Sequence, residues 1–257
     1  MFNGFNDNIW DEHKWEAHLN EIEKKSDQLR KFIAPDPSGN IPRWITLLQE
    51  NSDEMDAVDA FIEEELQIEE AYFPDEEDLD WDDDYDDELD DLIFGDLDED
   101  FFLEDDELDD FDAGEEWKEL SEDFAMSDHG SIETLDVYND ARALAAHILH
   151  WADGVHPRYR NQHYHDYVAN ILKAGAKLAA GYSFGFEQDL LGGNIAYTKK
   201  ALNLVNRSLD LLQEHLKNEP YTTSTAYQYQ HEALFHLRNH IGIYVQELRE
   251  QFYLGFQ

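Results

Sequence analysis

Histidines near the C-terminal end offer the clearest potential chemistry in this chain. Nine of the twelve histidines lie after residue 134. His147 and His150 are one helical turn apart, and Glu232 is followed by His236 and His240 at intervals of four residues. On a helix, residues three or four positions apart share a face, so each set can present its ligands to one side. Because imidazole and carboxylate groups bind divalent transition metals, one interpretation is a metal-binding helical-bundle enzyme or carrier that uses these five residues.

The chain contains no cysteine, which excludes disulfides, zinc–thiolate sites and thiol nucleophiles. Di-metal carboxylate bundles carry Glu-x-x-His on two helices, and residues 134–257 contain no such pair. The sequence also lacks a Gly-x-Ser-x-Gly elbow, a phosphate-binding loop and a Gly-x-Gly-x-x-Gly turn. The common hydrolase and nucleotide-binding signatures are therefore absent.

A second interpretation concerns the segment Arg160-Asn161-Gln162-His163-Tyr164-His165. An arginine followed by a polar residue, with a histidine after four intervening positions, resembles the motif of the HEPN ribonucleases, which are also small helical bundles. The resemblance covers six residues. It implies that Arg160 and His165 act on the RNA backbone across a dimer.

Charge is concentrated in one part of the chain. The protein has 257 residues, 61 of them acidic and 18 basic, and a net charge of −43. Residues 53–133 account for −39, whereas residues 1–52 carry −3 and residues 134–257 carry −1. Salt adaptation would spread acid over every surface, so the sequence indicates one specialised segment in a nearly neutral protein. Since counterion release needs positive charge at the contact, direct nucleic-acid binding is not expected.

The acidic segment also contains large apolar side chains. Residues 74–112 alternate acids with leucine, isoleucine and aromatic residues, a composition typical of amphipathic interaction segments. Like charges at every spacing prevent this stretch from packing as a core, so we expect residues 74–130 to be largely disordered. The candidate contacts to a basic protein or a cationic segment are Trp81, Tyr85, Phe94, Phe101, Phe102 and Phe111.

Helical periodicity dominates both sides of this segment. Before it, the spacing of apolar residues predicts a helix over 8–33, a short helix opened by Pro42, and a third helix capped by Ser52. After it, the spacing predicts four helices over 132–152, 158–180, 186–217 and 224–252. Four such helices joined by short turns are expected to form an antiparallel four-helix bundle.

The sequence therefore predicts an all-α protein with an N-terminal helical unit (1–73), an acidic segment (74–130) and a four-helix bundle (131–257). Whether the two helical parts pack together stays open, and homo-oligomers are possible.

The N-terminus lacks a secretory signal and no apolar run would span a bilayer, so a cytoplasmic location without membrane insertion is expected. The leading functional hypothesis is a non-enzymatic interaction or regulatory protein with no cofactor. The divalent metal site and the ribonuclease are the alternatives.

Lysine and arginine side chains from the second and third predicted bundle helices could gather on one face. The simpler explanation is that these side chains lie on ordinary solvent-exposed helix surface. The alternative is a positive face on which the acidic segment of the same chain docks, in competition with an anionic ligand. The basic residues in question are Arg158, Arg160, Lys173, Lys177, Lys199, Lys200 and Arg207.

Overall fold

The structure is a computed structural model that describes residues 9–33, 41–70 and 130–254. Within these ranges every regular element is a helix, which confirms the predicted fold class. None of the described helices combines the length and apolar character needed to cross a bilayer. The main helices are α1 (Glu12–Ile33), α2 (Arg43–Glu50), α3 (Glu54–Glu70), α6 (Asp136–Asp153), α7 (Gln162–Phe184), α8 (Leu191–Leu211) and α9 (Ser224–Leu254).

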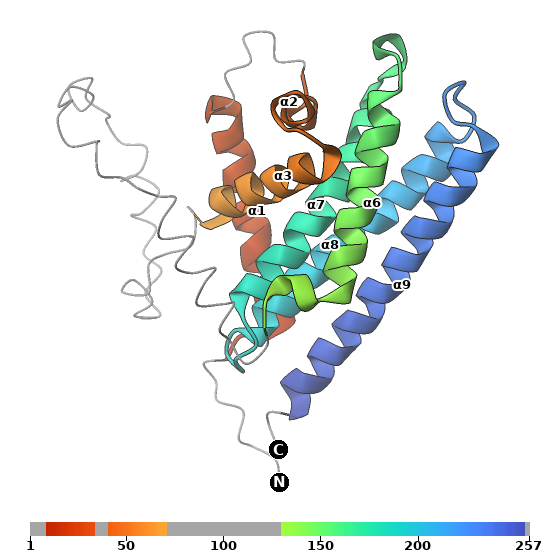
Figure 1. The fold of residues 1–257 in the computed structure, drawn as a ribbon. Helices are drawn as coiled ribbons and strands as arrows, with labels where there is room; N and C mark the ends of the chain where they lie inside the picture. Colours follow the sequence, from red (N-terminus) through yellow and green to blue (C-terminus); the bar gives the residue numbers. More distant parts are fainter. Residues whose placement is uncertain (1–8, 34–40, 71–129, 255–257) are drawn as a thin grey trace, which may run out of the picture. The chain divides into compact units, whose positions relative to one another are not determined.

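Helices α6 to α9 form the predicted antiparallel four-helix bundle (Figure 1). Each helix packs on the next along the chain, and α9 returns to pack on α6. Three short elements accompany them: the 3₁₀ turns η4 (Ile132–Thr134) and η5 (Pro157–Tyr159), and the π-helical turn η6 (Leu212–Leu216), which continues α8. The apolar stripes read from the sequence face inward, since Val168, Ile171, Val205 and Ile241 are all buried.

The observed helix ends differ from the predicted ends because periodicity locates a face but not a cap. The region after His156–Pro157 first forms η5, and α7 begins only after Asn161, whose side-chain oxygen accepts a hydrogen bond from the backbone N–H of Tyr164 at 3.0 Å. The predicted cap at Ser52 is wrong by one residue. Asp53 accepts the backbone N–H groups of Met55 and Asp56 instead, each at 2.9 Å.

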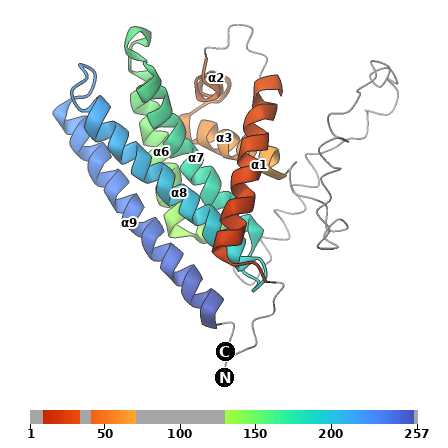
Figure 2. The same cartoon turned by 180° about the vertical axis from the view of Figure 1, so that it is seen from behind.

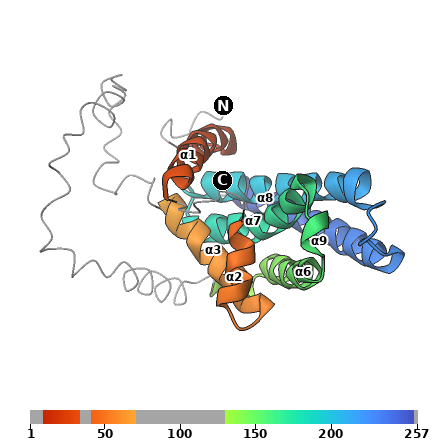
Figure 3. The ribbon, with the colours of Figure 1, turned by 90° about the horizontal axis from the view of Figure 1, so that it is seen from above.

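The N-terminal helices and the bundle belong to one compact unit, which settles the question that the sequence leaves open. Helix α3 packs on α6 and α7, and α1 packs along α8 (Figures 2 and 3). Trp44 of α2 is buried against the rings of Tyr164 and His165, with ring centroids 6.1 and 5.9 Å apart. One hydrophobic core thus contains side chains from helices on both sides of the acidic segment.

Candidate functional site

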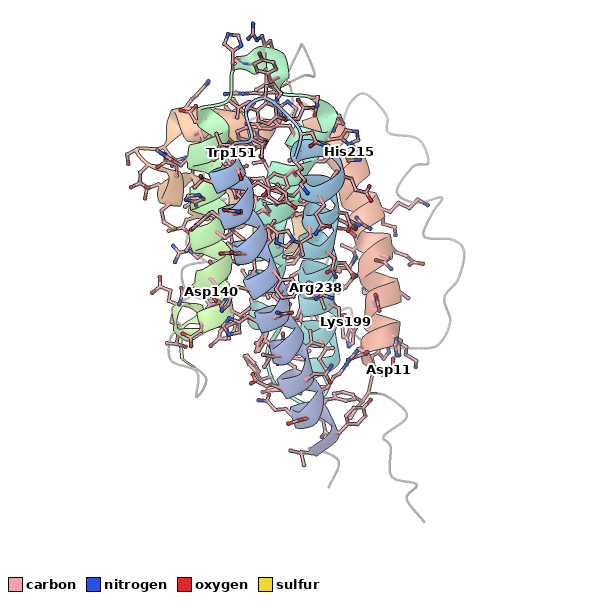
Figure 4. All side chains as sticks on the ribbon, turned by 90° about the vertical axis from the view of Figure 1, so that its right-hand side faces the viewer. Asp11, Asp140, Trp151, Lys199, His215 and Arg238 are labelled. Atoms are coloured by element: carbon pink, nitrogen blue, oxygen red, sulfur yellow. The ribbon has the colours of Figure 1, made fainter. Side chains whose placement is uncertain are left out.

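Two of the predicted metal ligands lie together at the seam between α6 and α9. His236 and His240 are one turn apart on α9, and both approach Asp140 of α6. The Nδ1 atom of His240 is 2.8 Å from Oδ2 of Asp140, and Nδ1 of His236 is 3.7 Å from the same oxygen. One ligand atom from each residue lies within 4.8 Å of the other two. Figure 4 looks onto α9, with the labelled Asp140 on α6 beside it.

Buried neighbours fix the two helix segments that carry these ligands. On α6, Val137 and Ala141 flank Asp140 and lie in the core, and on α9 Leu237 and Ile241 do the same beside His236 and His240. The ligand side chains therefore start from two packed helices rather than from loops. They differ in exposure: the side chains of Asp140, His240 and His236 are 42%, 32% and 74% exposed. This Asp140 cluster, made of Asp140, His236 and His240, is a site on the rim of the bundle.

The other predicted ligands lie elsewhere. The ring of His147 packs on Tyr229 with centroids 4.2 Å apart, and burial lowers the pKa of His147. His150 faces the N-terminal helices, with Nδ1 2.7 Å from Oε1 of Glu54. Glu232 is exposed on α9 and is not among the residues that converge on Asp140. Two of the five predicted residues thus share a site, and they do so around an acid that the sequence did not single out.

Asp140 could have been predicted as a candidate ligand only from the positions of α6 and α9 relative to each other along the bundle axis. Its spacing within residues 136–153 resembles that of any solvent-facing acid, and its ligand partners lie about a hundred residues later in the sequence. In an up-and-down bundle the first and fourth helices are neighbours, which makes an acid on one and histidines on the other a candidate pair. The acid and the histidines must also lie at the same level along the bundle axis. That level depends on the geometry of the turns between the helices.

The structure brings Arg160 and His165 close enough to interact at the turn between α6 and α7, and each also has contacts of its own. The guanidinium of Arg160 caps the end of α6: Nε donates to the carbonyl oxygen of Val155 at 2.8 Å, and a terminal NH₂ group donates to that of Asp153 at 3.1 Å. The ring of His165 packs near Trp44, and burial lowers the pKa of His165. Arg160 thus holds together the C-terminal turn of α6.

Basic side chains of α8 and α9 are covered by α1. Lys199 lies 2.7 Å from Glu16 and 3.4 Å from Glu12, and Arg249 forms a two-pronged ion pair with Glu12 at 2.7 and 2.6 Å. The hydrogen bond from Arg249 is the largest cause of the lowered pKa of Glu12. About two turns beyond Glu16 along α1, Lys200 contacts the carboxylate of Glu23 at 2.8 Å.

These contacts form the α1 ion-pair cluster, defined as Glu12, Glu16, Glu23, Lys199, Lys200 and Arg249. Figure 4 shows Lys199 where α8 meets α1. Of the basic residues that could have formed a face for the acidic segment, Lys199 and Lys200 face acids of α1, and Lys177 lies 3.9 Å from Glu23. Carboxylates do contact these lysines, and they come from α1, a helix with five acidic and five basic residues.

The predicted partner-binding residues Trp81, Tyr85, Phe94, Phe101, Phe102 and Phe111 lie outside the described residues. Comparisons of the chain with models of protein families, with curated proteins and with solved structures found no match.

Proposed function

We propose that this chain is a non-enzymatic interaction protein whose acidic, aromatic-rich segment (74–130) binds a basic partner. The observation that carries the proposal is the division of charge between this segment and the helical scaffold. Residues 53–133 hold −39 of the net −43, and the scaffold on either side is nearly neutral. A segment of this composition has the features of one that recognises a cationic surface with apolar pockets.

The α1 ion-pair cluster supports a partner outside the chain. Lys199, Lys200 and Arg249 already have carboxylate partners from α1, and Arg142 pairs with Asp59 of α3. An acidic segment that docked on these cations would have to displace carboxylates that are already in place. The counter-charge for most of the segment is therefore expected to come from another molecule.

The proposed mechanism has two stages. Long-range attraction between the segment and a basic surface speeds the encounter, and it is screened by salt because the charges meet in water. Large side chains such as Trp81, Phe94 and Phe101 then enter apolar pockets on the partner, which makes binding selective for basic surfaces that have such pockets. Under this mechanism, charge governs the rate and the salt dependence of binding, and the aromatic residues govern selectivity.

The test compares two synthetic peptides of equal positive charge, an oligolysine and a basic peptide that also carries leucine and tryptophan. We expect the full chain to bind both, with affinity falling steeply as NaCl is raised, and to prefer the amphipathic peptide. Replacing the six candidate aromatics by serine removes that preference and leaves oligolysine binding unchanged. Fluorescence anisotropy of labelled peptides measures both quantities.

Phe235→Ser is the matched control, because Phe235 is an exposed aromatic of α9 outside the acidic segment. It should leave both affinities as they are. The proposal is wrong if binding of the basic peptides is indifferent to ionic strength, or if it survives deletion of residues 74–112.

A further inference from the structure

We infer that Asp140, His236 and His240 form a binding site for one divalent first-row transition-metal ion, such as Zn²⁺. All three residues belong to the helical scaffold, and none lies in the acidic segment (74–130). Asp140 has two histidine neighbours where one would be enough to join the helices. The 2.8 Å contact between Asp140 and His240 is sufficient as a bridge between α6 and α9, yet a second imidazole lies 3.7 Å from the same carboxylate oxygen.

The spacing of the three donor atoms fits such an ion after a small adjustment. Ligands about 2.0–2.1 Å from a tetrahedral metal lie about 3.3 Å from one another. The two contacts to Asp140, at 2.8 and 3.7 Å, fall on either side of that value, and the three donor atoms lie within 4.8 Å of one another. His236 is 74% exposed and can change its side-chain torsions without disturbing the core. A shift of no more than about 1.5 Å, from the 4.8 Å limit to about 3.3 Å, therefore completes the set.

The donor types select the class of metal. Two imidazole nitrogens and one carboxylate suit Zn²⁺, Co²⁺, Ni²⁺ or Cu²⁺, whereas Mg²⁺ and Ca²⁺ prefer oxygen ligands throughout. The pair His236 and His240, at positions i and i+4 of one helix, presents both nitrogens to the same side, as paired histidines do in helical zinc sites. Three ligands from the protein leave at least one coordination position for water or for a ligand from another molecule.

Zinc titration of the full chain tests the site. After treatment with a chelator, the protein is titrated with Zn²⁺ against a chromophoric competitor in a large excess of Mg²⁺, which competes for carboxylate oxygens elsewhere in the chain. We expect one tight site per chain. His236→Ala and Asp140→Asn should each weaken it by about 10- to 100-fold or more, because the loss of outer-shell partners alone has that effect.

Two further measurements keep the test decisive. His150→Ala is the matched control, since His150 is a similarly exposed histidine that faces Glu54; it should leave the zinc affinity unchanged. With Co²⁺ as the probe, the visible d–d bands of the bound ion, whose intensity depends on its coordination number and geometry, should weaken or disappear in His236→Ala. His236 is so exposed that its loss should not impair folding, so this variant decides the matter if Asp140→Asn folds poorly.

The inference is overturned if His236→Ala and Asp140→Asn bind Zn²⁺ as tightly as the unmodified chain. It is equally overturned if His150→Ala weakens binding as much as they do.

Discussion

Gly192, in the first turn of α8, lets the chain before α1 approach that helix closely. A Cβ atom at this position would lie 2.5 Å from the carbonyl oxygen of Trp10 and 2.9 Å from Cδ1 of Trp15. Both distances are shorter than non-bonded atoms tolerate, and one of the two atoms belongs to the backbone. The absence of a side chain at Gly192 is therefore a condition for the docking of α1.

We predict that Gly192→Ala lowers the free energy of unfolding by about 1–3 kcal/mol, the usual cost of overpacking. Gly242→Ala is the matched control, because Gly242 lies inside α9 with no atom within 4 Å of the new methyl group. It should raise stability by about 0.5–1 kcal/mol, since alanine favours the helix. Urea unfolding followed by circular dichroism measures both changes. Equal effects of the same sign would contradict the proposed role of Gly192.

Residue spacing indicated only part of the candidate site. The four-residue interval between His236 and His240 suggested a shared face, and they do share one. By the same reasoning His147 and His150 were candidates, but the first packs on Tyr229 and the second on Glu54. Spacing tells which residues share a face of one helix. It does not tell which other helix that face meets, and so it could not single out Asp140.

At the scale of the secondary-structure element, α1 depends on charge as well as on apolar contact. Trp15, Leu19 and Ile22 are buried along it, and Glu12 pairs with Arg249 and Lys199 near its N-terminal end. The side chain of Glu12 is only 13% exposed, so these ion pairs are less screened than ordinary surface pairs. A bidentate contact between arginine and carboxylate also fixes the orientation of the two side chains relative to each other.

We predict that Glu12→Gln lowers the free energy of unfolding at neutral pH by about 1.5–3 kcal/mol, the range for hydrogen bonds to charged groups. The pKa of Glu12 is lowered from 4.5, chiefly by its hydrogen bond with Arg249. The stabilisation is thus fully present above pH 4.5 and is lost as pH falls through the lowered pKa. The difference between the unmodified chain and Glu12→Gln should shrink in acid.

Urea titrations over a series of pH values measure this difference, and Glu21→Gln, an exposed position on α1, serves as the control. The role assigned to Glu12 fails if the two variants have equal stability, or if the difference between Glu12→Gln and the unmodified chain does not depend on pH.

Most helices could be predicted from apolar periodicity, whereas their ends and partners could not. The segment 224–252 was expected to be helical, and α9 runs from Ser224 to Leu254. Near Pro157 the chain forms a 3₁₀ turn first, because the cap at Asn161 decides where α7 begins. The sequence offered two interpretations of the basic residues on the second and third bundle helices, solvated surface or a docking face for the acidic segment, and in the structure two of them, Lys199 and Lys200, contact acids of α1. That α1 supplies these acids follows from three-dimensional placement, which the pattern does not contain.

At the scale of the whole molecule, the helices that precede the acidic segment in the sequence complete the core of the bundle that follows it. Ile62 of α3 is buried, and its Cδ1 atom lies 3.4 Å from the position of a Cβ atom on Gly175 of α7. The amphipathic stripes on both sides of the segment show that each part has an apolar face to cover. They do not show that the two apolar faces pack against each other. The sequence alone therefore does not decide whether the two helical parts form one unit.

We predict that the scaffold unfolds in one cooperative step and that Ile62→Ala destabilises all of it by about 2–5 kcal/mol, the usual cost of truncating a buried isoleucine. Ile41→Ala is the control, because Ile41 is 58% exposed, and it should change stability by no more than about 0.5 kcal/mol. Circular dichroism and tryptophan fluorescence should report the same midpoint. Two separate transitions, only one of them shifted by Ile62→Ala, would show that the helical parts are independent.

The contact between Asp140 and His240 joins positions one hundred residues apart in a chain that has no cysteine. An ion bound there would act as a cross-link that can be removed, closing a loop of that length. A permanent cross-link over about 100 residues stabilises by about 4.7 kcal/mol through the entropy of the unfolded chain. The free energy of unfolding would then depend on metal supply, as it depends on redox conditions in proteins held by disulfides.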